Sequence, residues 1–364
     1  MSKTIFTILV VFLLTTIIGG GVWFFFFYKT VPGIEDFSAA VRDYFPFGKI
    51  ETPKTTSDQQ KTVAGENGAG NSNTGSVLSK VRLLSQIPVS GFVVIDATTT
   101  PLVRYMERAT GHIYEIGVKE ERARRITNTS IPRVYEAIFA PNGSFVIIRY
   151  LRDDGRTIET YSALIPESGG EGGELRGVFL PQGISTIAIS PDSKKIFYIT
   201  DFFDGSIGFT SGPQGENKQQ VFNHPLSEWI ATWGDIKSIY LTTKPSSGIP
   251  GYSFLLNQAT KTLEKVAGGL GLTTQTSPDL KLILTSTTNN SGELILGVYE
   301  TKSDTTVQFS PKTLSEKCAW GFDSSKIYCA VPVSLPNAKI PDVWYQGRVL
   351  FSDRIWTLDT QGGS

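Results

Sequence analysis

The stretch that decides the fold is residues 186–199, which read TIAISPDSKKIFYI. A turn built from Ser, Pro and Asp separates two short apolar runs, and the second run is rich in β-branched and aromatic residues. This pattern is typical of two antiparallel strands joined by a tight turn. The segment therefore predicts a β-hairpin whose turn is centred on Asp192.

Four further segments carry the same pattern. They read EAIFAPNGSFVII (136–148), WIATWGDIKSIYL (229–241), TTQTSPDLKLILT (273–285) and KCAWGFDSSKIYCA (317–330). The polar turn residues of the five copies are separated by 50, 43, 44 and 44 residues, and they are Asn142, Asp192, Asp235, Asp279 and Asp323. Every copy has Val or Ile four positions after this residue. Hairpins recurring at this period predict the four-stranded blades of a β-propeller.

The outer strands of the blades are expected between the hairpins, for example at residues 157–165, 251–256 and 293–299. Residues 91–118 form an opening repeat that lacks the Ser-Pro-Asp turn, which makes six recognisable repeats by Asp359. A propeller gains stability when its ring closes and leaves few open strand edges. Two arrangements remain open, a closed ring of six blades or a ring whose seventh blade is missing or completed elsewhere.

These repeats resemble those of the TolB-like and WD-repeat-like β-propeller families. The resemblance rests on the SPD-type turns followed by K-x-I-x-[FY] strands, and on outer strands such as TGHIYEI (110–116) and DRIWTLDT (353–360). It runs from about residue 85 to the last residue, and the TolB-like subtype is closer because the G-H…W-D signature of true WD repeats is absent. The resemblance implies an all-β propeller fold.

The composition excludes several functions. Lys plus Arg and Asp plus Glu number 34 each, so no field of one sign attracts nucleic acid, and a nucleic-acid partner is not expected. The chain has only two His and two Cys, which are too few for the usual zinc sites. We therefore expect no metal and no cofactor.

Residues 4–28 carry no charge and lie between Lys3 and Lys29. At about 1.5 Å per residue, a helix of this length exceeds the ~30 Å hydrocarbon core of a bilayer. Trp23 and Tyr28 near its end are residues that favour membrane interfaces. The sequence thus predicts that residues 1–29 form a cytoplasmic stub and an uncleaved transmembrane signal anchor running from Thr4 to Tyr28.

Three segments follow the predicted span. Residues 30–50 predict a short amphipathic juxtamembrane helix, because Ile34, Phe37, Val41 and Tyr44 share one helical face. Residues 51–79 are dominated by Thr, Ser, Asn, Gly and Gln, a composition that predicts a disordered polar linker. Residues 80–364 are assigned to the propeller.

Cys318 and Cys329 lie five residues before and six residues after Asp323, so they face each other across the predicted hairpin. Opposed residues on paired strands lie within disulfide range, and a cross-strand disulfide is one reading, with two buried thiols as the alternative. A disulfide indicates an extracytoplasmic propeller. The Lys and Arg residues around the span mildly favour the opposite orientation, and we give the cysteine pair more weight.

No constellation of catalytic residues is visible. His112 and His224 are far apart in sequence, and no G-x-S-x-G motif occurs. Asp153-Asp154-Gly155 and Asp201…Asp204-Gly205 are assigned to hairpin turns, and the glycine-rich residues 169–173 to a flexible loop. These observations predict that the chain is not an enzyme.

Aromatic and Arg residues are common at protein interfaces, and several lie on or beside the predicted innermost strands. They form the predicted binding surface at the channel mouth, with packing between blades as the alternative: Arg133, Tyr135, Trp229, Trp233 and Trp320. The resulting functional hypothesis is a membrane-anchored extracytoplasmic propeller that acts as a non-catalytic protein-interaction or ligand-binding module of an envelope or surface assembly. The alternative is an extracytoplasmic hydrolase or glycan-active propeller with its site at the channel mouth.

Overall fold

A computed structural model describes residues 82–95, 100–166, 172–303 and 305–360. The predicted membrane span, amphipathic helix and polar linker all precede residue 82 and lie outside these described residues. Within the described ranges, no helix has both the length and the apolar character needed to cross a membrane.

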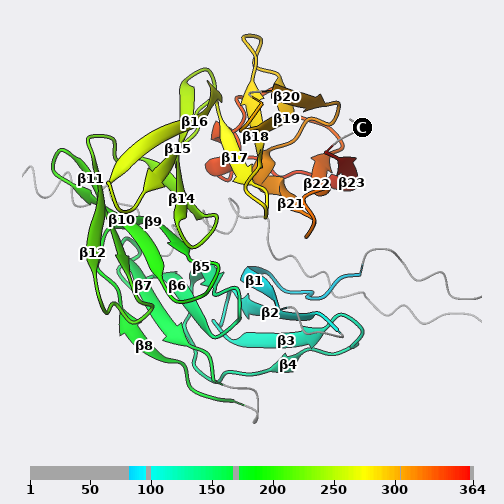
Figure 1. The fold of residues 1–364 in the computed structure, drawn as a ribbon. Coiled ribbons are helices and arrows are strands. Elements are labelled where there is room, and N and C mark those ends of the chain that lie inside the picture. Colours follow the sequence, from blue (N-terminus) through cyan, green and yellow to red (C-terminus); the bar gives the residue numbers. More distant parts are fainter. Residues whose placement is uncertain (1–81, 96–99, 167–171, 304, 361–364) are drawn as a thin grey trace, which may run out of the picture. The chain divides into compact units, whose positions relative to one another are not determined.

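The described chain folds into six antiparallel sheets, which follow one another in sequence order (Figure 1). The first three sheets, blades 1 to 3, each have four strands. Blade 1 contains β1 (Val89–Ile95), β2 (Leu102–Glu107), β3 (Ile113–Gly117) and β4 (Arg124–Arg125); blade 2 contains β5 (Val134–Phe139), β6 (Phe145–Leu151), β7 (Ile158–Leu164) and β8 (Arg176–Phe179); blade 3 contains β9 (Ile184–Ile189), β10 (Ile196–Phe202), β11 (Gly205–Ser211) and β12 (Gln219–His224).

The last three sheets differ at the end of the chain. Blade 4 contains β13 (Trp229–Trp233), β14 (Ser238–Thr243), β15 (Pro250–Asn257) and β16 (Thr262–Leu270), and blade 5 contains β17 (Thr273–Thr276), β18 (Leu282–Thr288), β19 (Leu294–Glu300) and β20 (Thr305–Phe309). Blade 6 has three strands among the described residues, β21 (Cys318–Trp320), β22 (Lys326–Pro332) and β23 (Asp353–Asp359). A 3₁₀ turn, η1 (Ser315–Lys317), precedes β21, and the short helix α3 (Asp342–Tyr345) lies between β22 and β23.

The polar residue at the centre of each repeated turn has one structural role. In all five copies its side-chain oxygen accepts a hydrogen bond from the backbone N–H two residues later, at 2.8–3.3 Å. Asn and Asp stabilise tight turns in this way. The five residues are Asn142, Asp192, Asp235, Asp279 and Asp323. The sequence repeat therefore corresponds to the same hydrogen-bonded turn in all five hairpins.

The β-branched residue four positions later anchors the core. None of the five is more than 1% exposed, and they are Val146, Ile196, Ile239, Ile283 and Ile327. The apolar clusters that contain four of them, all except Ile283, combine residues of neighbouring sheets, so the core lies between the blades. The inner strand β5 contacts both β1 and β9, and β9 contacts β13. The predicted all-β architecture with six repeats is confirmed.

Blade 4 departs from the register of the other repeats by one residue. The partner of Leu241 is Ala231, whereas the sequence repeat places Ile230 opposite it. The cause is a shorter turn, because the Gly234 N–H donates to Ser238 O while the equivalent bond in blade 3 runs from Ser190 N–H to Lys195 O. The other predicted cross-strand pairs, including Cys318 with Cys329, have the expected register.

Candidate functional site

Each blade is antiparallel, so its two ends can be told apart by their connections. The loop before the first strand lies at the same end as the turn between the second and third strands. We call this the upper end, and the end with the five repeated turns the lower end. The most exposed aromatic pair of the upper end is Phe202 and Phe203, in the turn between β10 and β11. Phe202 is 62% exposed and Phe203 is 97% exposed, with their rings 5.7 Å apart and edge to face.

The backbone of this turn holds both rings outward. Phe202 pairs with Gly205 in the β10–β11 ladder, so only Phe203 and Asp204 connect the two strands. Gly205 has φ +147°, and a Cβ at this position would lie 2.1 Å from His224 O. Glycine is required here by both conformation and space. The tight turn thus presents two adjacent phenyl rings to solvent.

A polar cluster in blade 2 occupies the same end. The side chain of Arg149 on β6 is largely buried and donates to Glu136 Oε2 and to Ile184 O, each at 2.8 Å. Its guanidinium also lies 5.2 Å from the ring centre of Tyr135, a cation–π distance. Because Ile184 belongs to β9, Arg149 connects blade 2 to blade 3 while its guanidinium lies beside the ring of Tyr135.

The Tyr135 hydroxyl stays protonated at neutral pH. Burial raises the pKa of this hydroxyl to about 12, although the positive charge of Arg149 lowers it in part. The residue as a whole is 37% exposed. Tyr135 can donate or accept a hydrogen bond from a bound molecule, but it is not suited to act as a base.

Arg133 was predicted to lie beside Tyr135, and the structure places it at the start of β5 with a left-handed backbone, φ 60°. Its guanidinium forms an ion pair with the exposed carboxylate of Asp153. The neighbouring Asp154 accepts hydrogen bonds from Thr157 and Arg156, and these bonds lower its pKa to about 2. The Asp153-Asp154-Gly155 segment is a capped turn, as expected from the sequence.

The predicted aromatic surface is wrong for two of its three Trp residues. Trp229 is 3% exposed and Trp233 is 9% exposed, and both belong to the apolar cluster between blades 3 and 4. The Trp229 ring packs against Phe222, His224 and Phe254. Inner strands offer one face to each neighbouring blade, so large rings on them fill the space between sheets. These two residues contribute to packing.

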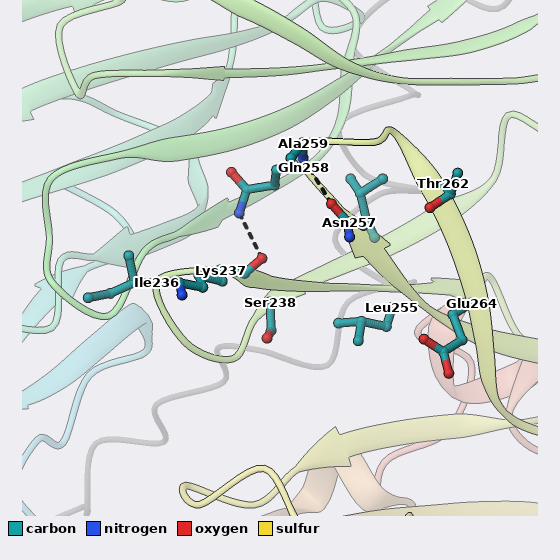
Figure 2. Close-up of a pocket in the computed structure, with 10 residues that line it drawn as sticks. Ile236, Lys237, Ser238, Leu255, Asn257, Gln258, Ala259, Thr262 and Glu264 are labelled. Atoms are coloured by element: carbon teal, nitrogen blue, oxygen red, sulfur yellow. Dashed lines mark hydrogen bonds between the residues drawn. The ribbon is translucent and has the colours of Figure 1, made fainter.

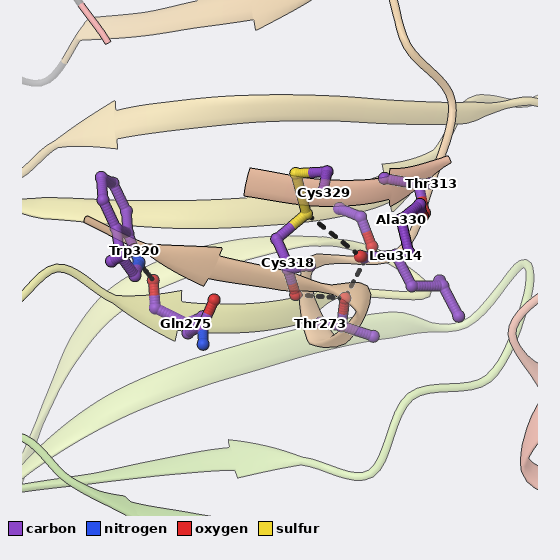
Figure 3. The surroundings of a disulfide bond; sticks show 10 residues. Thr273, Gln275, Thr313, Leu314, Cys318, Trp320, Cys329 and Ala330 are labelled. Carbon is purple, nitrogen blue, oxygen red and sulfur yellow. Dashed lines mark hydrogen bonds between the residues drawn. A yellow bond between two sulfur atoms is a disulfide. The ribbon is translucent and has the colours of Figure 1, made fainter. Parts of the chain in front are cut away.

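Trp320 is partly buried at the lower end of β21, where its indole Nε1 donates to Gln275 O of blade 5 at 3.3 Å (Figure 3). It therefore bridges blades 5 and 6 and lies at the end opposite Tyr135. The five predicted surface residues are not brought together, and only Arg133 and Tyr135 lie on the exposed upper surface.

Cys318 and Cys329 form a disulfide across the β21–β22 hairpin (Figure 3). The Gly321 N–H donates to Lys326 O, which makes residues 321 and 326 a hydrogen-bonded pair and leaves 318 and 329 in a non-hydrogen-bonded position. Side chains approach most closely at such positions. The bridge is buried in the cluster between blades 5 and 6 with Leu284 and Ile327.

Both His residues have structural partners. His224 Nδ1 accepts a hydrogen bond from the Leu226 N–H at 3.1 Å, and burial lowers the pKa of the imidazole, which is therefore neutral at pH 7. His112 Nε2 lies 3.1 Å from Ser130 Oγ. Among the described residues, no group of three or more His, Cys, Asp or Glu side chains is placed to hold a metal ion.

A cleft of about 510 Å³ lies at the lower end of blade 4, between the β13–β14 and β15–β16 turns (Figure 2). Lys237 and Glu264 are its charged lining residues, with Leu255 and Ile236 as apolar ones. The Gln258 amide donates to Lys237 O at 3.0 Å and closes one side of the cleft. The carboxylate and the ammonium give this cleft a lining of mixed polarity.

Comparisons with known proteins place this arrangement among solved folds. No protein-family model and no curated protein matches the chain. A puromycin-hydrolysing peptidase from Mycobacterium tuberculosis aligns with 75% of this chain and 44% of its own length, at 15% identity and a TM-score of 0.53. TolB from Acinetobacter baumannii aligns with 70% of this chain and 59% of its own length, at 12% identity and a TM-score of 0.49.

At these identities the likeness shows the fold alone. The described domain is a β-propeller of six sheets, as the repeat pattern predicted, and its likeness to TolB is one of fold. The chain spans only 44% and 59% of the lengths of the two aligned proteins. Their activities are therefore not transferred to it.

The prediction that the chain is not an enzyme is contradicted by these comparisons. It rested on two isolated His residues and on the missing G-x-S-x-G motif, yet the same sheet arrangement aligns with a puromycin-hydrolysing peptidase. One fold can support unrelated functions. A missing sequence motif in a propeller gives no ground for excluding activity.

The two exposed rings of this candidate surface were not singled out from the sequence. Phe202 and Phe203 lie in the D-F-F-D-G segment, which was interpreted only as a turn. A usable signal was present, because two adjacent large apolar residues at a two-residue turn cannot both face the core. The sequence around Arg149 did not indicate that this side chain bridges two blades, because its partner, Ile184 O, belongs to the next blade.

Proposed function

We propose that the propeller binds a protein partner at its upper end, with Phe202 and Phe203 as the central apolar contact. The observation that carries this proposal is the 97% exposure of Phe203 beside a second exposed ring. Large aromatic side chains without intramolecular cover are typical of interaction surfaces, and Phe, Tyr and Arg are enriched there.

Tyr135 and Arg133 extend the proposed surface on the neighbouring blade. Arg149 and its bonds to Glu136 and Ile184 pre-orient the Tyr135 ring, so little conformational entropy is lost on binding. The Arg133–Asp153 pair is exposed and supplies polar contacts at the rim. A partner with an apolar pocket and flanking polar groups fits this combination.

The location of the domain is also a proposal. We infer that residues 4–28 anchor the chain in a membrane and that residues 51–79 link this anchor to an extracytoplasmic propeller. The uncharged span and the disulfide support this, because disulfides persist in oxidising compartments. Free thiols at Cys318 and Cys329, in protein alkylated inside intact cells before lysis, would contradict this placement.

The binding proposal is tested by Phe203→Ala, with Phe322→Ala as a matched control. Phe322 is 92% exposed, but it lies in the repeated turn of blade 6 at the lower end. In quantitative affinity purification from detergent-solubilised membranes, at least one protein recovered with wild type and with Phe322→Ala should be depleted with Phe203→Ala. Truncating a central interface aromatic typically costs ~2 kcal/mol or more of binding free energy.

Identical recovery with all three proteins would contradict an upper-end contact centred on Phe203. A loss with Phe322→Ala alone would move the contact to the lower end. Thermal unfolding of both variants should match wild type, since neither ring is buried.

A further inference from the structure

The outermost described strand of blade 6 lacks the neighbour that covers its counterparts. The third strands of blades 1 to 5 each pair with a fourth strand, whereas β23 pairs only with β22 among the described residues. Six of the seven residues of β23 are exposed, while the third strands of the other blades are mostly buried or half-buried. Ile355 is 61% exposed and Trp356 is 45% exposed.

The hydrogen-bond pattern shows which backbone groups of β23 point away from the sheet. The Thr360 N–H donates to Ser325 O, and the Val333 N–H donates to Ser352 O. Antiparallel ladders alternate between bonded and non-bonded pairs, so even-numbered residues of β23 bond to β22. The N–H and C=O groups of Ile355 and Thr357 therefore face the open edge. Such an edge is a template for another strand.

We propose that β23 pairs antiparallel with β23 of a second copy of this chain, joining two blades 6 into one continuous sheet across a two-fold axis. Edge pairing requires an extended backbone, and an isologous contact requires a self-complementary strand. The sequence of β23 meets this requirement in one register, with Ile355 opposite Ile355 of the second copy.

In this register each charged side chain faces a neutral one. Asp353 lies opposite Thr357, and Arg354 lies opposite Trp356, where a cation–π contact can form. A slip that pairs Asp353 with Ile355 places Arg354 opposite Arg354 of the second copy. Like charges directly opposite each other are destabilising. Charge thus disfavours this slip, which the register centred on Ile355 avoids.

The first test measures the mass of the detergent-solubilised full chain by sedimentation equilibrium over a range of concentrations. Wild type should dimerise, and Ile355→Pro should dimerise at least about tenfold more weakly, because proline removes an N–H aimed at the partner. Proline is tolerated where a strand N–H faces solvent, and thermal unfolding checks that the variant folds. A wild-type monomer at all concentrations overturns the proposal, as does a dimer unaffected by Ile355→Pro in a folded variant.

The second test examines the register without disturbing the backbone. Ile355→Lys and Ile355→Glu should each be monomeric alone, because residue 355 lies opposite residue 355 of the second copy and the two like charges repel. An equimolar mixture of the two variants should dimerise, because the charges are then opposite. Failure of the mixture to dimerise, when both variants fold, contradicts the central position of Ile355. A synthetic peptide with the sequence of residues 352–360 should compete with the wild-type dimer; a peptide without effect contradicts pairing through β23.

Discussion

Trp229→Ala is expected to lower the free energy of unfolding of the propeller by about 3–5 kcal/mol, the range for removing a large aromatic ring from a packed core. The Trp229 ring is 3% exposed, with the rings of Phe222 and Phe254 at 5.5 and 6.0 Å. Its indole N–H also donates to Leu226 O at 2.9 Å. The substitution therefore opens a cavity between blades 3 and 4 and removes one of the two side-chain hydrogen bonds that Leu226 O accepts, the other coming from Ser206 Oγ.

Phe322→Ala is the matched control for this prediction, because Phe322 is 92% exposed in the repeated turn of blade 6 and lines no described core cluster. Its effect on unfolding should stay within about 1 kcal/mol, as for most surface substitutions. Thermal and denaturant unfolding of the three proteins give the comparison. Equal midpoints for Trp229→Ala and wild type would show that Trp229 does not fill the core between blades.

The paired substitution Cys318→Ala/Cys329→Ala is expected to lower the free energy of unfolding by about 2 kcal/mol. The bridge closes a loop with a sequence separation of 11 residues. Chain-entropy models assign about 3 kcal/mol to a loop of roughly 15 residues, so a shorter loop contributes less. The fold should persist, because blade 6 retains the buried Ile327, Val331 and Leu358.

A reductant provides the control for the cysteine prediction. It should shift the unfolding midpoint of wild type toward that of the paired variant and leave the variant unchanged. A wild-type midpoint that does not respond to reductant, under conditions in which both thiols become alkylated, would show that the bridge contributes no stability.

Local sequence chemistry predicted most of the fold. Each Asn or Asp at the turn centre accepts a hydrogen bond from the N–H two residues later, and each Val or Ile four positions on is buried. Both features depend on residues that lie close together in the sequence, so the sequence pattern could predict them. The cysteine pair followed from the same hairpin register. The one-residue shift in blade 4 was not predicted, because it depends on the length of one turn.

The candidate site was predicted less well, because it depends on contacts between blades. Trp229 and Tyr135 both lie on inner strands, yet Trp229 is covered by blade 3 and Tyr135 remains 37% exposed. A single sequence indicates that a side chain is large and aromatic, but the neighbouring sheet decides whether it is covered. The exposure of Phe203 could have been predicted from the sequence, because a residue at the tip of a two-residue turn is exposed whatever the neighbouring sheet.

The most direct test of an upper-end binding surface is the dissociation constant of the complex with the partner that is depleted by Phe203→Ala. Measured with purified proteins, Phe203→Ala should weaken binding at least about tenfold, which corresponds to roughly 1.4 kcal/mol. Phe322→Ala, which changes a residue that is 92% exposed at the lower end, should bind as wild type does. Equal dissociation constants for wild type and Phe203→Ala, or weakening by Phe322→Ala alone, would contradict the proposed surface.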